Sequence, residues 1–270
     1  MQLEPHLKTR VLGRNFIFRH QVSSTNTVAA ELAALGMPEG TVVCADTQTA
    51  GRGRQRRRWH SPPGRNLYFS VLLRPRRPLA EASQMALVAG LAVVRGLESL
   101  PAAPRGADGA AGLQLKWPND IFLGGRKLCG ILCEMPSWRP RPALVVGIGI
   151  NLALGAAELP AELQDRAISL QEAWHLEVPR AEALAAVLGE LEALYAEWQA
   201  HGLEPLLPAL GARSSLLGRP IVAETPAGVV EGTAVGILPS GNLAIRLADG
   251  SAAEIAAGDV HLRGGPGRSA

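Results

Sequence analysis

The sequence predicts an α+β protein in which a mixed sheet flanked by helices is followed by a small β-barrel. Apolar runs typical of strands and apolar stripes typical of helices intermingle as far as residue 212. From residue 213 the pattern changes to short strands separated by turns rich in Pro, Gly and Asn. Hydrophobic residues form 47% of the 270 positions, which is enough for a sizeable core. We therefore expect a larger domain at 1–212, a barrel at 213–263 and a disordered tail at 264–270.

The composition indicates the cellular setting. The net charge is only +3, so the basic character of the chain is local rather than general. Cys44, Cys129 and Cys133 lack the spacing of a disulfide framework and are expected to be free thiols in a reducing compartment. The N-terminus has no apolar signal region, and no apolar run approaches the ~20 residues of a membrane span. We expect a cytoplasmic protein without membrane contact.

Strands and one helix alternate in the first part of the chain. Strands are expected at 16–18, 41–44 and 66–73, where β-branched and aromatic residues gather. A helix between the first two begins at the capping residues 23–26 and ends before Gly36. Its apolar stripe consists of Val28, Leu32 and Leu35.

A hairpin turn at 124–125 is the most specific geometric feature of the sequence. The two-residue Gly-Gly turn pairs Phe122 with Lys127. Strict alternation then places four residues on one face: Asp120, Phe122, Lys127 and Cys129. Asp120 and Lys127 become diagonal neighbours with backbones roughly 7–8 Å apart. Further strands are expected at 113–117 and 143–152.

Helices and barrel strands complete the predicted elements. Residues 80–100 are apolar nearly all round, which predicts a buried helix. A capping box at 169–172 begins a short helix, and Pro179 begins a long one. The long helix carries an apolar stripe of Leu184, Val187, Leu188, Leu191, Leu194, Tyr195 and Trp198. The barrel strands are expected near 220–225, 229–238, 242–248 and 252–255.

A run of arginines within residues 46–60 is the strongest local charge feature. Five arginines fall in the seven positions 52–58, and Gly51 and Gly53 leave the backbone free to adopt unusual conformations. Ordering about a dozen loop residues costs on the order of 10 kcal/mol. Charge-assisted hydrogen bonds return roughly 1.5–3 kcal/mol each. We expect a loop that is disordered alone and closes on a phosphate-bearing ligand; the alternative is a solvated basic loop without a ligand.

Four separated motifs resemble those of the biotin–protein ligase family, in the same order and at similar spacing. They are Ser24-Thr25-Asn26, Gln48-Thr-Ala-Gly-Arg-Gly-Arg54 with Trp59, Lys116-Trp-Pro-Asn-Asp120 with Arg126-Lys127-Leu-Cys-Gly130, and Gly147-Ile-Gly149-Ile-Asn151. The resemblance covers residues 14–263 and implies a class II synthetase-like catalytic domain followed by an SH3-like barrel. One departure is Arg56, which stands where the family usually has glycine. If that glycine has a positive φ, arginine costs roughly 1–2 kcal/mol there.

The resemblance implies a biotin site and an adjoining ATP site. The residues implied for biotin are Ser24, Thr25, Asn26, Gln48, Gly51, Arg52, Gly53, Arg54, Lys127, Gly130, Gly147 and Gly149. The residues implied for ATP or the adenylate are Arg52, Arg54, Arg57, Trp59, Lys116, Asn119, Asp120 and Asn151. A urea ring has one acceptor and two donors, which hydroxyl and amide side chains can match.

Each implied site residue has an expected role. Lys127 and Arg54 are the implied catalytic residues, and Lys127 would reduce the repulsion between the biotin carboxylate and the α-phosphate. Arg54 and Arg57 would neutralise phosphate, and Trp59 would pack near the adenine. Asn151 would reach the phosphate region. The last three biotin-site glycines would let the biotin tail lie against the backbone.

The implied activity is an AMP-forming ligation. Biotin and ATP, with Mg²⁺, would give biotinyl-5′-AMP, and the biotinyl group would pass to a lysine of a biotin carboxyl carrier protein. The motifs identify no metal ligands beyond Asn119 and Asp120 as candidates. The family also allows a homodimer. Only ~20 residues precede the first motif, too few for the helix-turn-helix domain of some members, so no specific DNA binding is expected.

Two alternatives remain at this point. A lipoate–protein ligase or octanoyltransferase has a similar fold, although the Gly-Arg-Gly-Arg loop and the Lys-Trp-Pro-Asn-Asp motif favour biotin. A nucleic-acid-binding protein could use the basic loop, but the chain lacks interleaved aromatic residues and a second basic face.

Overall fold

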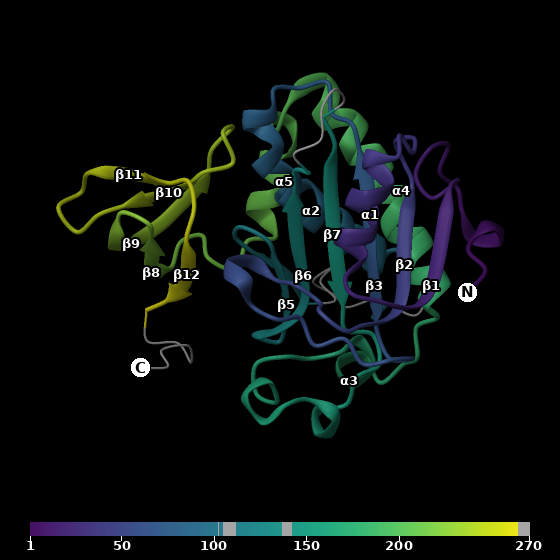
Figure 1. Cartoon of the computed structure of the whole chain (residues 1–270). Helices are drawn as coiled ribbons and strands as arrows, with labels where there is room; N and C mark the ends of the chain where they lie inside the picture. The colour runs from purple at the N-terminus through teal and green to yellow at the C-terminus, as the bar shows by residue number, and fades with distance from the viewer. Residues whose placement is uncertain (102, 105–111, 137–141, 264–270) are drawn as a thin grey trace.

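The chain folds into two sheets of different size. The computed structural model describes residues 1–101, 103–104, 112–136 and 142–263. A seven-stranded sheet carries helices on both faces, and a five-stranded sheet lies beside it (Figure 1). The α+β class and the mixed sheet were predicted correctly. The predicted tail at 264–270 lies outside the described residues.

The larger sheet has the strand order β1-β2-β3-β7-β6-β5-β4. Its strands are β1 (Phe16–Val22), β2 (Val42–Gln48), β3 (Leu67–Leu73), β4 (Leu113–Lys116), β5 (Asp120–Leu123), β6 (Arg126–Glu134) and β7 (Leu144–Ile150). β1 and β2 run parallel, and the other neighbouring strands run antiparallel. Every residue of β3 is buried, because the centre of the sheet is covered on both faces.

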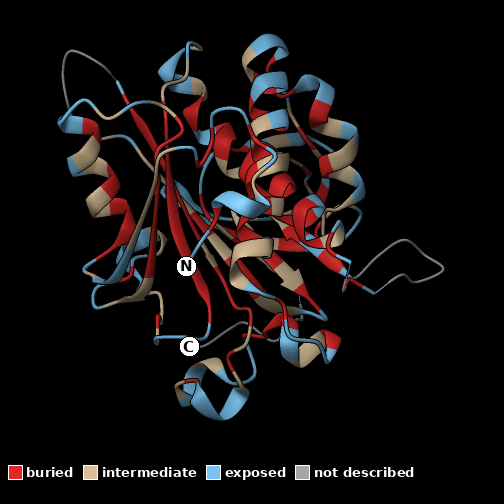
Figure 2. Ribbon diagram, turned by 90° about the vertical axis from the view of Figure 1, so that its right-hand side faces the viewer, coloured by how far each residue is buried: buried red, intermediate tan, exposed pale blue. Residues whose placement is uncertain are grey.

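Helices cover the two faces unequally. α1 (Thr25–Ala34) packs on β2, β3 and β7 from one side, and α2 (Met85–Glu98) and α4 (Arg180–His201) lie together on the other. Figure 2 shows the buried residues along the strands and on the inner faces of these helices. The apolar stripe predicted for α4 is confirmed, since each of its residues is buried. The shorter helices are α3 (Leu170–Trp174), α5 (Leu207–Ala212) and the 3₁₀ turns Glu4–His6, Arg54–Arg56, Leu79–Gln84, Ala156–Glu158, Ala161–Leu163 and Glu204–Leu206.

The stripe predicted for α1 is wrong at Leu35, which is 81% exposed. The helix ends at Ala34, and the chain turns away because Gly36 takes a φ of 82°. The residues of α1 that are buried are Thr25, Asn26, Ala29 and Ala33. The small alanines let the helix lie close to the sheet, and this brings the polar first turn into the interior.

The hairpin register was predicted correctly at its turn but not at its base. Phe122 pairs with Lys127 as expected, but a β-bulge follows, so that Ile121 pairs with Cys129 and Asp120 with Gly130. Cys129 therefore faces the core rather than sharing a face with Lys127. The bulge arises where the backbone of Lys127 bonds outside the sheet, to Arg166 O at 2.7 Å and Ile168 N at 3.0 Å.

The smaller sheet is antiparallel with the order β11-β10-β9-β8-β12. Its strands are β8 (Pro220–Thr225), β9 (Gly228–Ile237), β10 (Leu243–Arg246), β11 (Ala252–Ile255) and β12 (Asp259–Leu262). The four strands expected from the sequence are present, and β12 was not predicted. One apolar cluster runs from the large sheet into this one, which fixes their relative position.

Two compositional expectations can be compared with the fold. Cys44, Cys129 and Cys133 are free thiols, as predicted. Among the described residues, the segment Leu79–Glu98 is the one helical stretch long and apolar enough to cross a membrane, but 72% of it is buried inside the protein. Such burial is typical of a core helix.

Candidate active site

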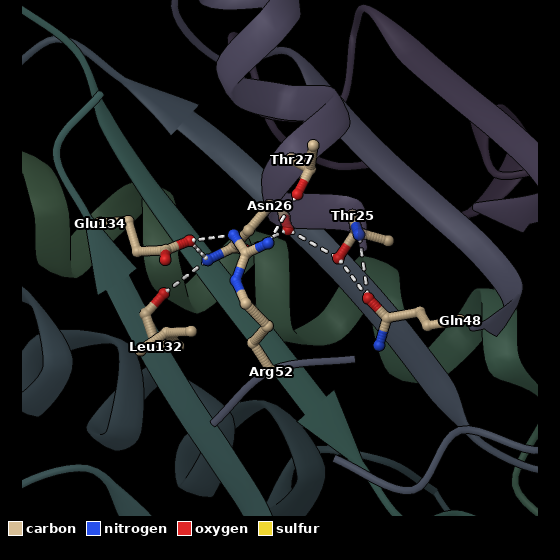
Figure 3. A network of polar contacts seen from close by, with 8 residues as sticks. Thr25, Asn26, Thr27, Gln48, Arg52, Leu132 and Glu134 are labelled. Atoms are coloured by element: carbon tan, nitrogen blue, oxygen red, sulfur yellow. Dashed lines mark hydrogen bonds and ion pairs between the residues drawn. The ribbon is translucent and has the colours of Figure 1, made fainter. Parts of the chain in front are cut away.

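A buried polar cluster occupies the first turn of α1. Ser24 is the N-cap residue of this helix but makes no side-chain cap bond. Thr25 donates its backbone N–H to Gln48 Oε1 at 2.9 Å (Figure 3). Ser70, from the otherwise apolar strand β3, lies 2.8 Å from Thr25 Oγ1 and 2.6 Å from Asn26 Oδ1. Hydrogen-bonding groups from α1, β2 and β3 therefore converge on the face of the sheet that α1 covers.

Counting protons limits the directions of these bonds. An amide oxygen can only accept, so Ser70 Oγ donates its one proton to Asn26. The one hydroxyl proton of Thr25 then serves either Ser70 Oγ at 2.8 Å or Gln48 Oε1 at 3.2 Å, and in both cases Thr25 Oγ1 accepts no proton from Ser70. Gln48 Nε2 donates one proton to Ser61 Oγ at 3.0 Å. A lone pair on Thr25 Oγ1 and a second proton on Gln48 Nε2 remain for a ligand, which suits a neutral group that both donates and accepts.

The side-chain amide of Asn26 forms its hydrogen bonds within the protein, so its donors are not available to a ligand. Its Nδ2 donates to Leu132 O at 3.2 Å and to Glu134 Oε2 at 2.7 Å, and its oxygen accepts from Ser70 (Figure 3). A Cβ at Gly147 would overlap the Asn26 side chain. Gly147 thus makes room for Asn26, and its contact with the biotin tail stays a prediction.

The basic loop has a defined, narrow shape. Its two arms pair through Trp59 N to Gly51 O at 2.9 Å and Gly53 N to Arg57 O at 2.7 Å. At the tip, Gln55 and Arg56 have φ values of 54° and 60°. The positive φ considered for Arg56 is therefore present, and Gln55 shares it. The expected disorder of the unliganded loop stays a prediction.

Three arginines fasten this loop to different parts of the protein. Arg52 donates to Thr27 Oγ1 at 2.7 Å and pairs with Glu134 at 2.8 Å. Arg54 donates to Asn119 Oδ1 at 3.1 Å and to Gly258 O at 3.3 Å. Arg57 pairs with Asp259 at the start of β12. The loop is thus held by α1 and β6 on one arm and by the C-terminal sheet on the other.

The Trp59 indole covers the glycines of the sheet. Gly130 and Gly149 are paired across β6 and β7. A Cβ on Gly149 would lie 2.6 Å from Trp59 Nε1, and one on Gly130 would lie 2.9 Å from Trp59 Cζ3. The buried indole Nε1 finds no hydrogen-bond partner among the described residues. A ligand tail can contact the backbone of these two glycines only if Trp59 moves away. With Trp59 in place, the tail would run along the indole ring.

Lys127 lies beside this tryptophan at the base of the bulge. Its Nζ is 2.7 Å from Asp120 Oδ1 and 5.5 Å from the centre of the Trp59 ring. The diagonal neighbourhood of Asp120 and Lys127 was predicted, and the bulge does not abolish it. Asp120 holds the ammonium in place without burying it completely, so an arriving anion can still reach it.

Lys116 adds a second ammonium to the same region. Its Nζ is 5.0 Å from the centre of the Phe122 ring. Burial lowers the pKa of Lys116, Asp120 raises it, and Lys127 lowers it again, with a net decrease. A bound phosphate would offset this decrease, because a nearby anion favours the protonated amine.

Asn151 does not point into this group of cations. Its side chain is buried, with Nδ2 3.5 Å from Lys127 O and Oδ1 3.4 Å from Asn66 Nδ2. Its backbone N–H bonds to Leu128 O at 2.9 Å. Asn151 supports the bulge that carries Lys127, and its contact with the phosphate region stays a prediction.

Several residues of the site were missed from the sequence. Ser70 is a polar residue in an apolar strand, a signal that could have been used. Glu134, Gly258 and Asp259 carried no local signal, because each reaches the loop only through the folding of distant segments. Within the described residues no group of three or more His, Cys, Asp or Glu side chains could hold a metal ion.

The site therefore joins a neutral polar cluster to a group of cations, with the glycine pair and Trp59 between them. This arrangement is suited to a small acid with a neutral polar head and to the phosphates of a nucleotide that activates it.

Comparisons with known proteins agree with this chemistry. The model of the biotin/lipoate A/B protein ligase family matches residues 18–151, and that of the biotin protein ligase C-terminal domain matches residues 216–263. A biotin–[acetyl-CoA-carboxylase] ligase of Mycobacterium tuberculosis is 35% identical over 96% of each chain. The bifunctional ligase/repressor BirA of Bacillus subtilis is 39% identical over 90% of this chain and 73% of its own.

A solved structure extends the similarity to the fold. The biotin protein ligase from Aquifex aeolicus in complex with biotin and ATP is 32% identical, with a TM-score of 0.78 over 93% of this chain and 99% of that one. The chain belongs to the biotin protein ligase family.

Proposed function

We propose that the chain joins biotin to a protein lysine in two ATP-dependent steps. The observation that carries the proposal is the position of Lys127, whose ammonium lies between the glycine pair under Trp59 and the carboxylate of Asp120. A fixed cation at that point can hold a carboxylate and a phosphate together, which is what the first step requires.

The geometry suggests a binding role for each part of the site. Thr25 Oγ1 accepts a ureido N–H and Gln48 Nε2 donates to the ureido oxygen, which uses the two positions left open by the internal hydrogen bonds. The biotin carboxylate pairs with Lys127. Arg54 donates to two neutral acceptors, so its charge is available to phosphate, and Arg57 exchanges Asp259 for phosphate.

The chemistry then follows in two balanced steps. A biotin carboxylate oxygen attacks the α-phosphorus of ATP, a P–O bond forms, and the bond to pyrophosphate breaks. The electrostatic field of Lys127 lowers the repulsion between the two anions. In the second step the neutral amine of the acceptor lysine attacks the acyl carbon, an N–C bond forms, the C–O bond breaks with its electron pair on AMP, and the nitrogen loses a proton to solvent. The closed basic loop keeps water from the mixed anhydride in the interval.

Mg²⁺ enters this scheme as the partner of ATP. Mg²⁺ is commonly held by one or two carboxylates together with substrate phosphates. Asp120, with Asn119 beside it, would supply one such carboxylate, which fits a metal carried mainly by the nucleotide. The metal would neutralise phosphate charge when bound.

The protein partner and the setting complete the proposal. The acceptor is a biotin carboxyl carrier protein, and the enzyme works in the cytoplasm, as a homodimer or alone, without binding specific DNA. The division into a catalytic part at 1–212 and a C-terminal part at 213–263 is supported by two separate sheets. The contacts of Arg54 and Arg57 with Gly258 and Asp259 make the C-terminal part a support for the basic loop.

Exchange of labelled pyrophosphate into ATP tests the first step without a protein partner. The exchange should depend on biotin and fail with lipoate or octanoate at equal concentration. Exchange with lipoate but not with biotin would show that the chain activates lipoate, as a lipoate–protein ligase does. No exchange with any of the three acids would refute the adenylation step.

A further inference from the structure

One carboxylate oxygen joins the polar cluster to the basic loop. Glu134 Oε2 accepts from Asn26 Nδ2 at 2.7 Å and from Arg52 Nη2 at 2.8 Å (Figure 3). The three residues come from the end of β6, the first turn of α1 and the first arm of the loop. Figure 3 shows the Arg52 guanidinium lying against Asn26 and Glu134.

The guanidinium also reaches the outer side of α1. Arg52 Nη1 donates to Thr27 Oγ1 at 2.7 Å, so the loop arm lies across the first turn of the helix. Thr25, one residue before Asn26, offers the free acceptor of the polar cluster. The contacts of Arg52 therefore determine whether the loop covers that end of the site.

Glu134 is suited to hold this arm because its carboxylate accepts a hydrogen bond from Asn26, a side chain that is itself fixed in place. Asn26 is buried and fixed by Ser70 and by Leu132 O, so it cannot rotate away with the loop. Glu134 and Arg52 are 38% and 40% exposed at their side chains, so water can separate the pair when the loop opens. An anchored but solvent-accessible ion pair can form and break repeatedly.

We propose that Glu134 is a positioning residue that latches the basic loop over the head-group end of the biotin site. The proposal rests on the proposed function and assigns to Glu134 the retention of biotin and of biotinyl-5′-AMP. Glu134 contacts neither the reacting atoms nor Lys127, whose ammonium is held by Asp120. Loss of the latch should therefore speed ligand release more than it slows adenylation.

The first test uses the protein without ligand. Trypsin cleaves after arginine, and residues 52–58 contain five arginines. Glu134→Gln keeps the shape of the side chain but removes its charge, and it should speed cleavage in this loop about fivefold, the upper range for an exposed ion pair. The matched control is Glu158→Gln, which removes the charge of a similarly exposed partner of Arg65, 2.9 Å away and outside residues 52–58.

The second test measures retention of the intermediate. Glu134→Gln should release biotinyl-5′-AMP about fivefold faster, seen as biotin on added bystander protein, while the kcat of pyrophosphate exchange stays within about twofold. Exchange of the two charges, Arg52→Glu with Glu134→Arg, should restore part of the retention. A role in folding alone would lower the yield of folded protein and would not respond to this exchange.

The outcomes separate the latch from the proposed function. Biotin-dependent exchange in the wild type together with unchanged cleavage and unchanged release in Glu134→Gln would overturn the latch and leave the ligase reaction intact. Faster cleavage in the variant of a protein that performs no exchange would support the latch and refute the reaction. Equal effects of Glu134→Gln and Glu158→Gln would also overturn the latch.

Discussion

Arg56 lies at the tip of the basic loop with a φ of 60°, and its replacement by glycine should tighten biotin binding. A left-handed conformation costs a residue with a Cβ about 1–2 kcal/mol. Glycine has more freedom in the open loop, which opposes closure by about 0.5–1 kcal/mol. The difference favours the glycine loop by about 0.5–1 kcal/mol, or roughly two- to fivefold in Kd.

The comparison must separate strain from charge. Arg56→Ala removes the same charge as Arg56→Gly but keeps the Cβ, so the two variants differ mainly in backbone strain. A second control, Gln55→Gly, relieves strain at the neighbouring φ of 54° without any change of charge. Calorimetric titration with biotin should give the order Arg56→Gly tighter than Arg56→Ala, with Gln55→Gly tighter than wild type.

Two results would refute this reasoning. Equal affinities of Arg56→Gly and Arg56→Ala would show that the φ at this position does not limit loop closure. A Kd of Arg56→Gly more than about fivefold weaker than that of wild type would show that the arginine side chain itself stabilises the closed loop.

Three further predictions concern catalysis, retention and stability. Lys127→Ala should lower pyrophosphate exchange at least about 100-fold, as expected when a preorganised charge is removed, and near-normal exchange would exclude its catalytic role. Arg54→Gly should release biotinyl-5′-AMP that labels bystander lysines; absence of labelling would count against retention by Arg54. Burial raises the pKa of Glu192, but backbone N–H groups of 10–12 lower it more, so the net shift is downward. Glu192→Gln should therefore cost about 1–2 kcal/mol of unfolding free energy at pH 7, measured by urea titration, and this difference should shrink below pH 4.5, the ordinary value.

Sequence reasoning correctly predicted the positions of residues that depend only on their neighbours along the chain. The Gly-Gly turn determined that Phe122 faces Lys127, and it brought Asp120 within reach of the Lys127 ammonium. The helical period of α4 identified all the large residues of its buried face and missed only the small Ala183 and Ala185. Both inferences depend on short-range geometry, in which each position follows from its neighbours along the chain.

Residues that act through distant segments could not be placed in this way. The bulge after Ile121 depends on the segment around Ala167, which bonds to the Lys127 backbone. The structure fills the space at Gly147 and Gly149 with Asn26 and Trp59, and the contact of these glycines with the biotin tail stays a prediction. The sequence indicates that a glycine avoids a close neighbour, but it does not identify that neighbour.

Periodicity and turn chemistry were enough to predict the order of most elements and the hairpin register at its turn. The residues of the site followed from the resemblance of four motifs to those of the biotin–protein ligase family. The tertiary structure alone decided that Glu134 and Asp259 hold the two arms of the basic loop. The reason is physical: Arg52 and Arg57 are separated from these partners by 82 and 202 positions. Only the strand order of the large sheet brings Glu134 to Arg52, and only the packing of the two sheets brings Asp259 to Arg57.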